Sequence, residues 1–222
     1  MPIRSAEEAL ALLRARGVMA LAALPPLPSL VEEVAGEPVR GSWWAHAEGG
    51  EIYRIANELE DHPEVLLAKL VAGKVTFVHA RLWPALYRVV TDPGWRSAAV
   101  AAASPAARRL LTAVAAAETL RFDTYLADAP AAERAARRLA KDEVDKGMLA
   151  RAAQVHTSSG RHATVLSSWE AWAPPEVVAA AAMLELEQAR REISEAVAGC
   201  LTPLTTLASS ASSSRARSTP KR

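Results

Sequence analysis

Four cationic side chains recur every three or four residues in the second half of the chain, a spacing that places them along one helix. They are Arg134, Arg137, Arg138 and Lys141. Cations arranged along a helix are typical of contacts to nucleic-acid phosphates. Acidic residues alternate with them at Glu133, Asp142, Glu143 and Asp145, a spacing that also suits ordinary ion pairs on a solvated helix. Both interpretations stay open at the level of sequence.

A polar segment that follows combines imidazole and guanidinium groups with turn-forming residues. His156 and His162 flank Thr157-Ser158-Ser159-Gly160-Arg161, which favours a hairpin loop. Arg161 and His162 in such a loop can contact a nucleic-acid backbone. Two imidazoles without a carboxylate or thiolate do not complete a zinc site, so we expect no metal and no cofactor.

A third candidate lies near the N-terminus, where two aromatic rings and an imidazole stand in one loop. Trp43, Trp44 and His46 precede the flexible pair Gly49-Gly50. Such a loop can stack a nucleobase or hold a small ligand. The alternative is that the tryptophans cover the core beside a helix entrance.

A further cationic cluster surrounds the segment 74–79. It comprises Lys69, Lys74, His79, Arg81 and Trp83. Paired cations of this kind can bind phosphate, but they are also typical of a solvated strand edge.

The composition gives few additional indications of function. In 222 residues, 26 Lys and Arg stand against 25 Asp and Glu, so the formal charge of +1 does not by itself indicate a polyanionic partner. The single cysteine, Cys200, excludes an internal disulfide. Charged residues interrupt every apolar run before bilayer length, and we expect a cytoplasmic protein with no membrane contact.

The elements that must position these groups are mostly helical. Residues 1–95 are predicted as a helical region that opens with a capped helix at 5–16, includes a helix at 63–70 and has one short strand at 74–79. Residues 104–172 begin with the Ser104-Pro105 cap of a helix, continue through a short strand and a helix at 131–146, and end in a hairpin. A helix at 176–200 and a disordered, basic, Ser-rich tail at 207–222 follow. The fold class is mainly α with short β elements, and the sequence shows no convincing internal repeat.

The element order over 104–172 resembles the winged-helix DNA-binding superfamily. That resemblance implies that the helix at 131–146 enters the major groove while the hairpin loop touches the flanking backbone. The stretch from Lys141 to Trp169 is also faintly similar to tandem winged-helix DNA glycosylases. Those enzymes use a Gln-x-Gln or Gln-x-Asp motif, whereas this chain has Gln154-Val155-His156, so no catalytic residue is assigned.

The leading hypothesis is therefore a DNA-associated protein with one winged-helix-like module in its second half. An extension of this hypothesis places a second, diverged module in the first half. The protein is non-catalytic or accessory to nucleic-acid processing, and its partner is duplex DNA. One alternative is a protein-interaction module that uses the C-terminal helix to bind a protein partner, with Met183, Leu184, Leu186 and Ile193 as the apolar face. The other is a nucleic-acid-processing enzyme whose site lies in the loop 43–50.

Overall fold

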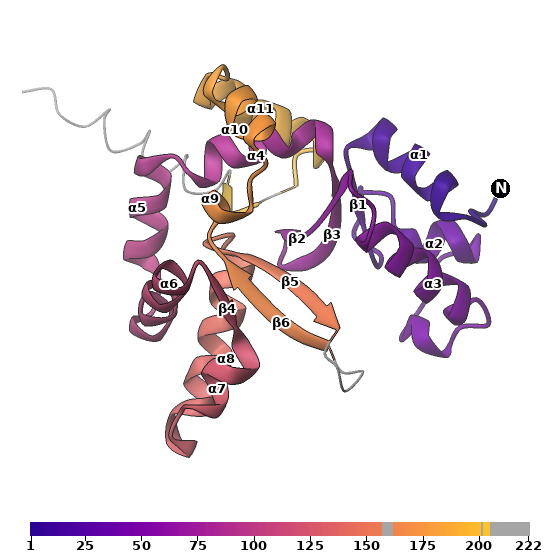
Figure 1. The fold of residues 1–222 in the computed structure, drawn as a ribbon. Helices are drawn as coiled ribbons and strands as arrows, with labels where there is room; N and C mark the ends of the chain where they lie inside the picture. The colour runs from indigo at the N-terminus through magenta and orange to yellow at the C-terminus, as the bar shows by residue number, and fades with distance from the viewer. Residues whose placement is uncertain (157–161, 201, 205–222) are drawn as a thin grey trace, which may run out of the picture.

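A computed structural model describes residues 1–156, 162–200 and 202–204. The described chain is mainly helical with two small antiparallel sheets, which confirms the predicted fold class (Figure 1). The predicted tail at 207–222 lies outside the described residues.

The first half of the chain forms one α/β unit, which we call the first unit. In chain order it comprises α1 (Ala6–Arg16), β1 (Val18–Ala20), α2 (Leu30–Ala35), the short helix η1 (Trp43–Ala45), α3 (Gly49–Glu60), β2 (Val65–Val71) and β3 (Lys74–His79). Ser5 and Ser29 cap α1 and α2 by accepting backbone N–H bonds. The strand order in the sheet is β1-β3-β2.

Apart from η1, the second unit repeats this order of elements. It comprises α6 (Pro105–Ala117), β4 (Thr119–Arg121), α7 (Phe122–Ala127), α8 (Ala131–Lys146), β5 (Arg151–His156) and β6 (His162–Ser167). Its sheet has the order β4-β6-β5, so the first strand again pairs with the third and the third with the second. The fold thus contains a repeat of topology that the residue types do not reveal.

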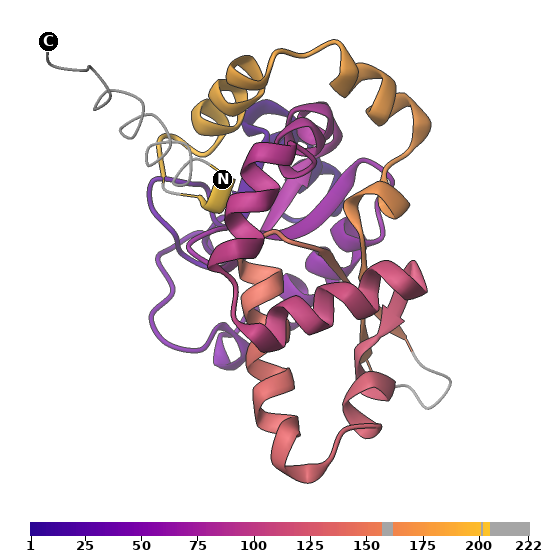
Figure 2. The same ribbon diagram turned by 90° about the vertical axis from the view of Figure 1, so that its left-hand side faces the viewer.

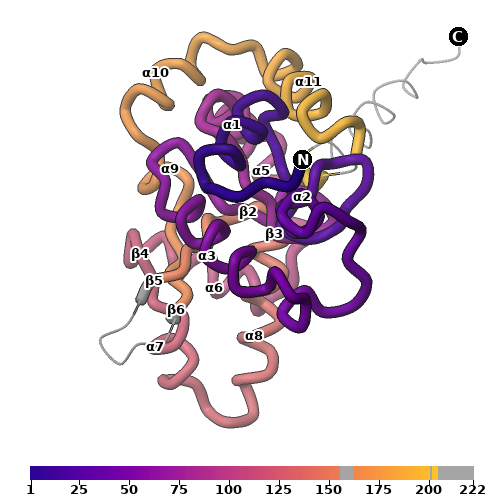
Figure 3. The backbone as a smooth tube through the Cα atoms, turned by 90° about the vertical axis from the view of Figure 1, so that its right-hand side faces the viewer, coloured from indigo at the N-terminus to yellow at the C-terminus, as the bar shows by residue number. Residues whose placement is uncertain are grey.

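Helices outside the two units join them into one body. These are η2 (Ala80–Leu82), α4 (Trp83–Val90) and α5 (Pro93–Ala102) between the units, and α9 (Trp169–Trp172), α10 (Pro175–Ala182) and α11 (Leu186–Ala196) after the second. Both α10 and α11 pack on α4, at the end of the molecule opposite α7 and α8 (Figures 1 and 3).

Two predicted elements were wrong. The first half has three described strands rather than one, because Val65–Val71 is a strand and not a helix and because Val18–Ala20 forms a strand that was not predicted. This strand is buried at both ends and half-buried in the middle, and such strands read as continuous apolar runs without the alternation that distinguishes strand from helix. The predicted helix at 176–200 is two helices, and at the break between them Arg88 Nε donates to the Leu184 carbonyl oxygen at 3.1 Å.

The first sheet has apolar side chains on both faces. Met19, Val65 and Phe77 pack against α1, α2 and α3, whereas Val18, Leu66 and Val78 belong to the larger core that runs through α4 into the second unit. A continuous core therefore connects the two units, and it includes Ala140 and Val144 of α8.

Candidate functional site

The helix α8 has two halves with different surroundings. Its C-terminal half is anchored, because Ala140 and Val144 are buried and α8 packs against α6. Its N-terminal half, together with α7, projects from the body (Figures 1 and 2). The bounds 131–146 agree with the prediction from sequence. An anchored helix with a projecting N-terminal half can insert into a groove of a partner without rearrangement of the core.

The first unit fixes the C-terminal end of α8. Lys69 Nζ on β2 lies 2.6 Å from Asp145 Oδ2, and the Asp145 side chain is only 10% exposed. The two-residue turn between β2 and β3 contacts α8 as well: a Cβ on Gly73 would lie 3.0 Å from Cγ of Lys146. Gly73 has φ +66°, a conformation that glycine adopts without steric cost. The β2–β3 hairpin is therefore a strut against α8.

A small cavity of about 130 Å³ lies where β2, α8 and β5 meet. Its charged lining residues are Glu60, Lys69, Lys141 and Asp145, and Gln154 adds an amide. The two lysines and two acids balance in formal charge. Gln154, which stands at the start of the motif compared with glycosylases, donates through its amide to Thr164 Oγ1 at 3.3 Å.

Two of the predicted phosphate-binding residues have partners within the chain. Arg137 Nη1 donates to the Tyr125 carbonyl oxygen at 2.7 Å, its Cζ lies 4.3 Å from the centre of the Tyr125 ring, and Nη2 lies 3.3 Å from Glu133 Oε2. Lys141 Nζ lies 3.6 Å from Asp142 and 3.9 Å from Asp145. These contacts make Arg137 a brace between α7 and α8.

The other two predicted phosphate-binding residues of α8, Arg134 and Arg138, face solvent. Arg134 is exposed and uses Nε to donate to the Ala129 carbonyl oxygen at 3.2 Å. Arg138 is exposed and has no hydrogen-bond or ion-pair partner within the described part of the chain. The two are four residues apart and therefore lie on one face of the helix. Exposed alanines surround them at positions 131, 132, 135 and 136, which keeps this half of α8 slim.

The predicted wing lies mostly outside the described residues, and this includes Arg161. His162 begins β6, where its backbone pairs with that of His156 at the end of β5. The hairpin and the projecting half of α8 both lie in the lower half of the molecule, but they diverge in Figure 1, where the hairpin points to the lower right and α7 and α8 lie below and to the left of it (Figures 1 and 3). The structure thus brings the described ends of the hairpin to the same half of the molecule as the projecting half of α8.

The N-terminal aromatic loop forms a compact surface cluster. The Trp43 and Trp44 rings stack with their centres 4.0 Å apart, and Trp44 also contacts the ring of Tyr53 at 5.3 Å. Trp43 packs against the core, whereas Trp44 is 63% exposed and Tyr53 is 40% exposed. The sequence analysis missed Tyr53, although its position one turn into α3 was a usable signal. Trp43, Trp44 and Tyr53 are called the aromatic patch below.

His46 takes part in the structure of this loop. Its Nδ1 accepts the backbone N–H of Glu48 at 3.2 Å, and its Nε2 lies 3.5 Å from Glu37 Oε1. These contacts hold the segment that leads into α3. The ring does not touch a group that it would activate as a nucleophile, so the loop offers no arrangement typical of general-base catalysis.

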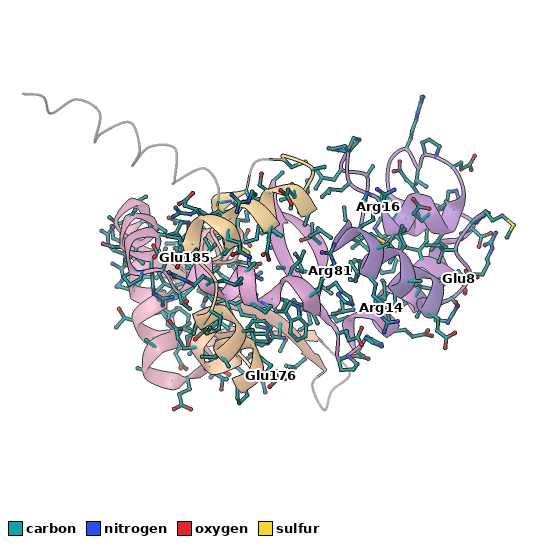
Figure 4. The ribbon with its side chains drawn as sticks, turned by 90° about the horizontal axis from the view of Figure 1, so that it is seen from above. Glu8, Arg14, Arg16, Arg81, Glu176 and Glu185 are labelled. Carbon is teal, nitrogen blue, oxygen red and sulfur yellow. The ribbon has the colours of Figure 1, made fainter. Side chains whose placement is uncertain are left out.

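The cationic cluster predicted around 74–79 is dispersed. Lys69 points to α8, His79 Nε2 lies 3.1 Å from Glu64 Oε2, and Arg81 Nε donates to the Arg14 carbonyl oxygen at 3.1 Å. Arg14 itself lies 2.8 Å from Glu64. Figure 4 labels Arg14 and Arg81 near the C-terminal end of α1, where the negative end of the helix dipole favours cations.

Arg151, at the start of β5, is a cation that the sequence analysis did not single out. Its guanidinium carbon lies 5.9 Å from the ring centre of Trp172, and its Nε has no hydrogen-bond partner within the described part of the chain. Burial lowers the pKa of Arg151, and the charge of Glu60 opposes that effect. The guanidinium is part of the packing beside Trp172.

The described residues hold no group of three or more His, Cys, Asp and Glu side chains arranged for a metal ion. None of the described helices combines the length and apolarity needed to span a bilayer. Comparison of the chain with protein-family models, curated proteins and solved structures gave no match.

Proposed function

We propose that the chain is a DNA-associated, non-catalytic protein of winged-helix type, in which the second unit binds duplex DNA through α8 and the β5–β6 hairpin. The observation that carries the proposal is the projecting N-terminal half of α8 with Arg134 and Arg138 on one exposed face. The twice-repeated order of elements, with the first strand pairing to the third in each sheet, supports a pair of winged-helix-like modules.

The second unit is more positively charged than the first, as binding to DNA requires. Residues 5–79 contain 11 acidic and six basic residues, a net charge of −5, whereas residues 104–172 contain ten basic and eight acidic residues, a net charge of +2. Because phosphate contacts dominate affinity for DNA, the second unit is the favoured one to face the duplex.

The shape of α8 adds a second argument. A recognition helix places the residues of its N-terminal half against base edges in the major groove. In α8 four of the eight residues of this half, 131–138, are exposed alanines, which allow close approach of the backbone and suit contacts to thymine methyl groups. Arg134 and Arg138 then lie along the helix where phosphates or guanine edges come within reach.

The corresponding helix of the first unit is poorly suited to the same role. On α3, Arg54 donates to Glu51 and to Glu58, so its charge is already matched by two carboxylates. These hydrogen bonds raise the pKa of Arg54 and lower that of Glu51. The hairpin of this unit is also occupied as the strut against α8.

The test is a fluorescence-polarisation titration of a labelled duplex with the full chain at low and moderate salt. We expect affinity to fall as salt rises, because phosphate contacts release counterions. Absence of binding at low salt would overturn the proposal.

Single-residue variants then locate the contact. Arg134→Ala and Arg138→Ala should weaken binding about equally for unrelated duplex sequences and reduce the salt slope by about one per lost phosphate contact. The matched control is Arg191→Ala, which removes one exposed positive charge from α11, at the opposite end of the molecule. If Arg191→Ala weakens binding as much as Arg138→Ala, the affinity reflects net charge and the assignment to α8 is wrong.

A further inference from the structure

The aromatic patch is rigidly built, although much of it is exposed. The backbone of η1 rests directly on the first turn of α3, because a Cβ on Gly49 would lie only 3.0 Å from the Trp43 carbonyl oxygen and 3.1 Å from that of Trp44. The half-buried ring of Trp43 in turn supports the stacked ring of Trp44. The rings are thus in place before any partner arrives, which lowers the entropic cost of binding.

Carboxylates surround this patch and outnumber the cations. Residues 37–60 contain five acidic and two basic residues, and Arg4, which lies 3.1 Å from Glu48, adds a third cation, so the net charge here is −2. Glu37 is 69% exposed in its side chain, and Glu48 and Glu51 flank the start of α3 with about a third of each side chain exposed (37% and 32%). Exposed aromatic faces within a negative field are chemically complementary to cations, and to guanidinium groups above all.

We propose that the aromatic patch is a docking surface for an arginine-containing peptide segment of a protein partner. An arginine side chain stacks on the exposed face of Trp44 beside Tyr53. Neighbouring cations of the peptide are attracted by Glu37, which is 69% exposed and lies beside His46, whereas Glu48 and Glu51 are already paired with Arg4 and Arg54. The proposal concerns the first unit and is independent of DNA binding by the second.

Charge decides between this occupant and a nucleic acid. A single-stranded nucleic acid can also stack bases on exposed tryptophan, but such sites combine the aromatic rings with a positively charged groove that follows the phosphates. Here the surrounding charge has the opposite sign, so phosphates are repelled and cations attracted. The same argument disfavours an acidic peptide.

The experiment measures polarisation of a labelled Arg-Ser repeat peptide titrated with the full chain. We expect Trp44→Ala to weaken binding about two- to fivefold, the range that an exposed cation–π contact corresponds to. Trp44→Phe should retain part of the affinity, because phenylalanine keeps an aromatic face. The matched control is Met183→Ala, which removes an 85% exposed apolar side chain between α10 and α11 and should leave binding unchanged.

Two further measurements make the result decisive. Replacing arginine by glutamine in the peptide should abolish binding, and circular dichroism should show that Trp44→Ala is folded. If that variant does not fold, Tyr53→Ala takes its place with the same expected direction. Equal binding of the glutamine peptide, unchanged binding by Trp44→Ala or Tyr53→Ala, or a Trp44-dependent affinity for oligothymidine that exceeds the affinity for the peptide would each overturn the proposal.

Discussion

Replacing Arg137 by alanine should destabilise the corner between α7 and α8, although the residue looks like a phosphate contact in the sequence. The variant loses a charge-assisted hydrogen bond to the Tyr125 carbonyl oxygen, the stacking on the Tyr125 ring and an exposed pair with Glu133. Typical values are about 1.5–3 kcal/mol for the hydrogen bond, about 0.5–1 for the cation–π contact and about 0.2–0.5 for the pair. Because these contributions overlap, we expect a loss of about 2–3 kcal/mol in the free energy of unfolding.

Urea denaturation followed by circular dichroism measures this loss. With a slope of roughly 2 kcal/mol per molar urea, the midpoint should fall by about 1–1.5 M. Arg138→Ala is the matched control and should stay within about 0.5 kcal/mol of the wild type, because its side chain is exposed and has no partner in the described chain.

Arg137→Lys separates structure from DNA contact. Lysine keeps the positive charge but cannot reproduce the planar guanidinium that bonds and stacks at Tyr125, so its loss of stability should approach that of alanine while duplex affinity is mostly retained. The contrary outcome is that Arg137→Ala has the same urea midpoint of unfolding as the wild type and loses duplex binding as Arg138→Ala does. Arg137 would then be a phosphate contact, and its contacts within the chain would not matter for stability.

Two further predictions concern the first unit. Lys69→Ala should lower stability by about 1–3 kcal/mol, because it leaves the largely buried Asp145 carboxylate without its nearest cation; adding Asp145→Ala should recover part of the loss in a double-mutant cycle of urea midpoints. Glu64 should show its effect through pH: hydrogen bonds from Arg14, and secondarily from His79, lower its pKa below the usual glutamate value. The ionised Glu64 therefore stabilises the fold at pH values above its unfolded-state pKa, and this contribution disappears as the pH falls through its folded-state pKa. Wild type and Glu64→Gln should differ slightly in melting temperature at pH 7 and converge in acid. A difference that grows on acidification would contradict this prediction.

Helix positions were predictable where the signal lies in neighbouring residues of the sequence, such as a capping serine or a run of charged residues. The Ser5 and Ser104 caps predicted the starts of α1 and α6, and the bounds of α8 agree with the charged segment from which they were read. The strands β1 and β2 were not predictable in this way. Both are largely buried and apolar, so their identity depends on pairing with β3 rather than on any period of their own.

The helix that carries the proposed site was predictable in position, but the tertiary contacts of its residues were not. The spacing of cations along α8 indicates the pair between Glu133 and Arg137 but does not reveal that Tyr125 also engages Arg137, because that contact depends on where α7 turns back. The partner of Asp145 was equally hidden, since Lys69 lies in the other unit, 76 residues away in the printed sequence. Residue type and spacing indicate which groups can meet phosphate, whereas tertiary contacts decide which of them are free to do so.

The two units share one topology but differ in the lengths of their hairpin turns and in the charges of their helices. In the first unit, β2 and β3 are joined by Ala72-Gly73, and this short turn fits against Lys146 at the end of α8. In the second, five residues separate β5 from β6. The strut restrains the C-terminal end of α8 through the β2–β3 turn and the Lys69–Asp145 pair, so the projecting N-terminal half is held at a fixed angle to the body. Loosening the first unit by Lys69→Ala should therefore weaken duplex binding even though Lys69 lies outside the proposed interface.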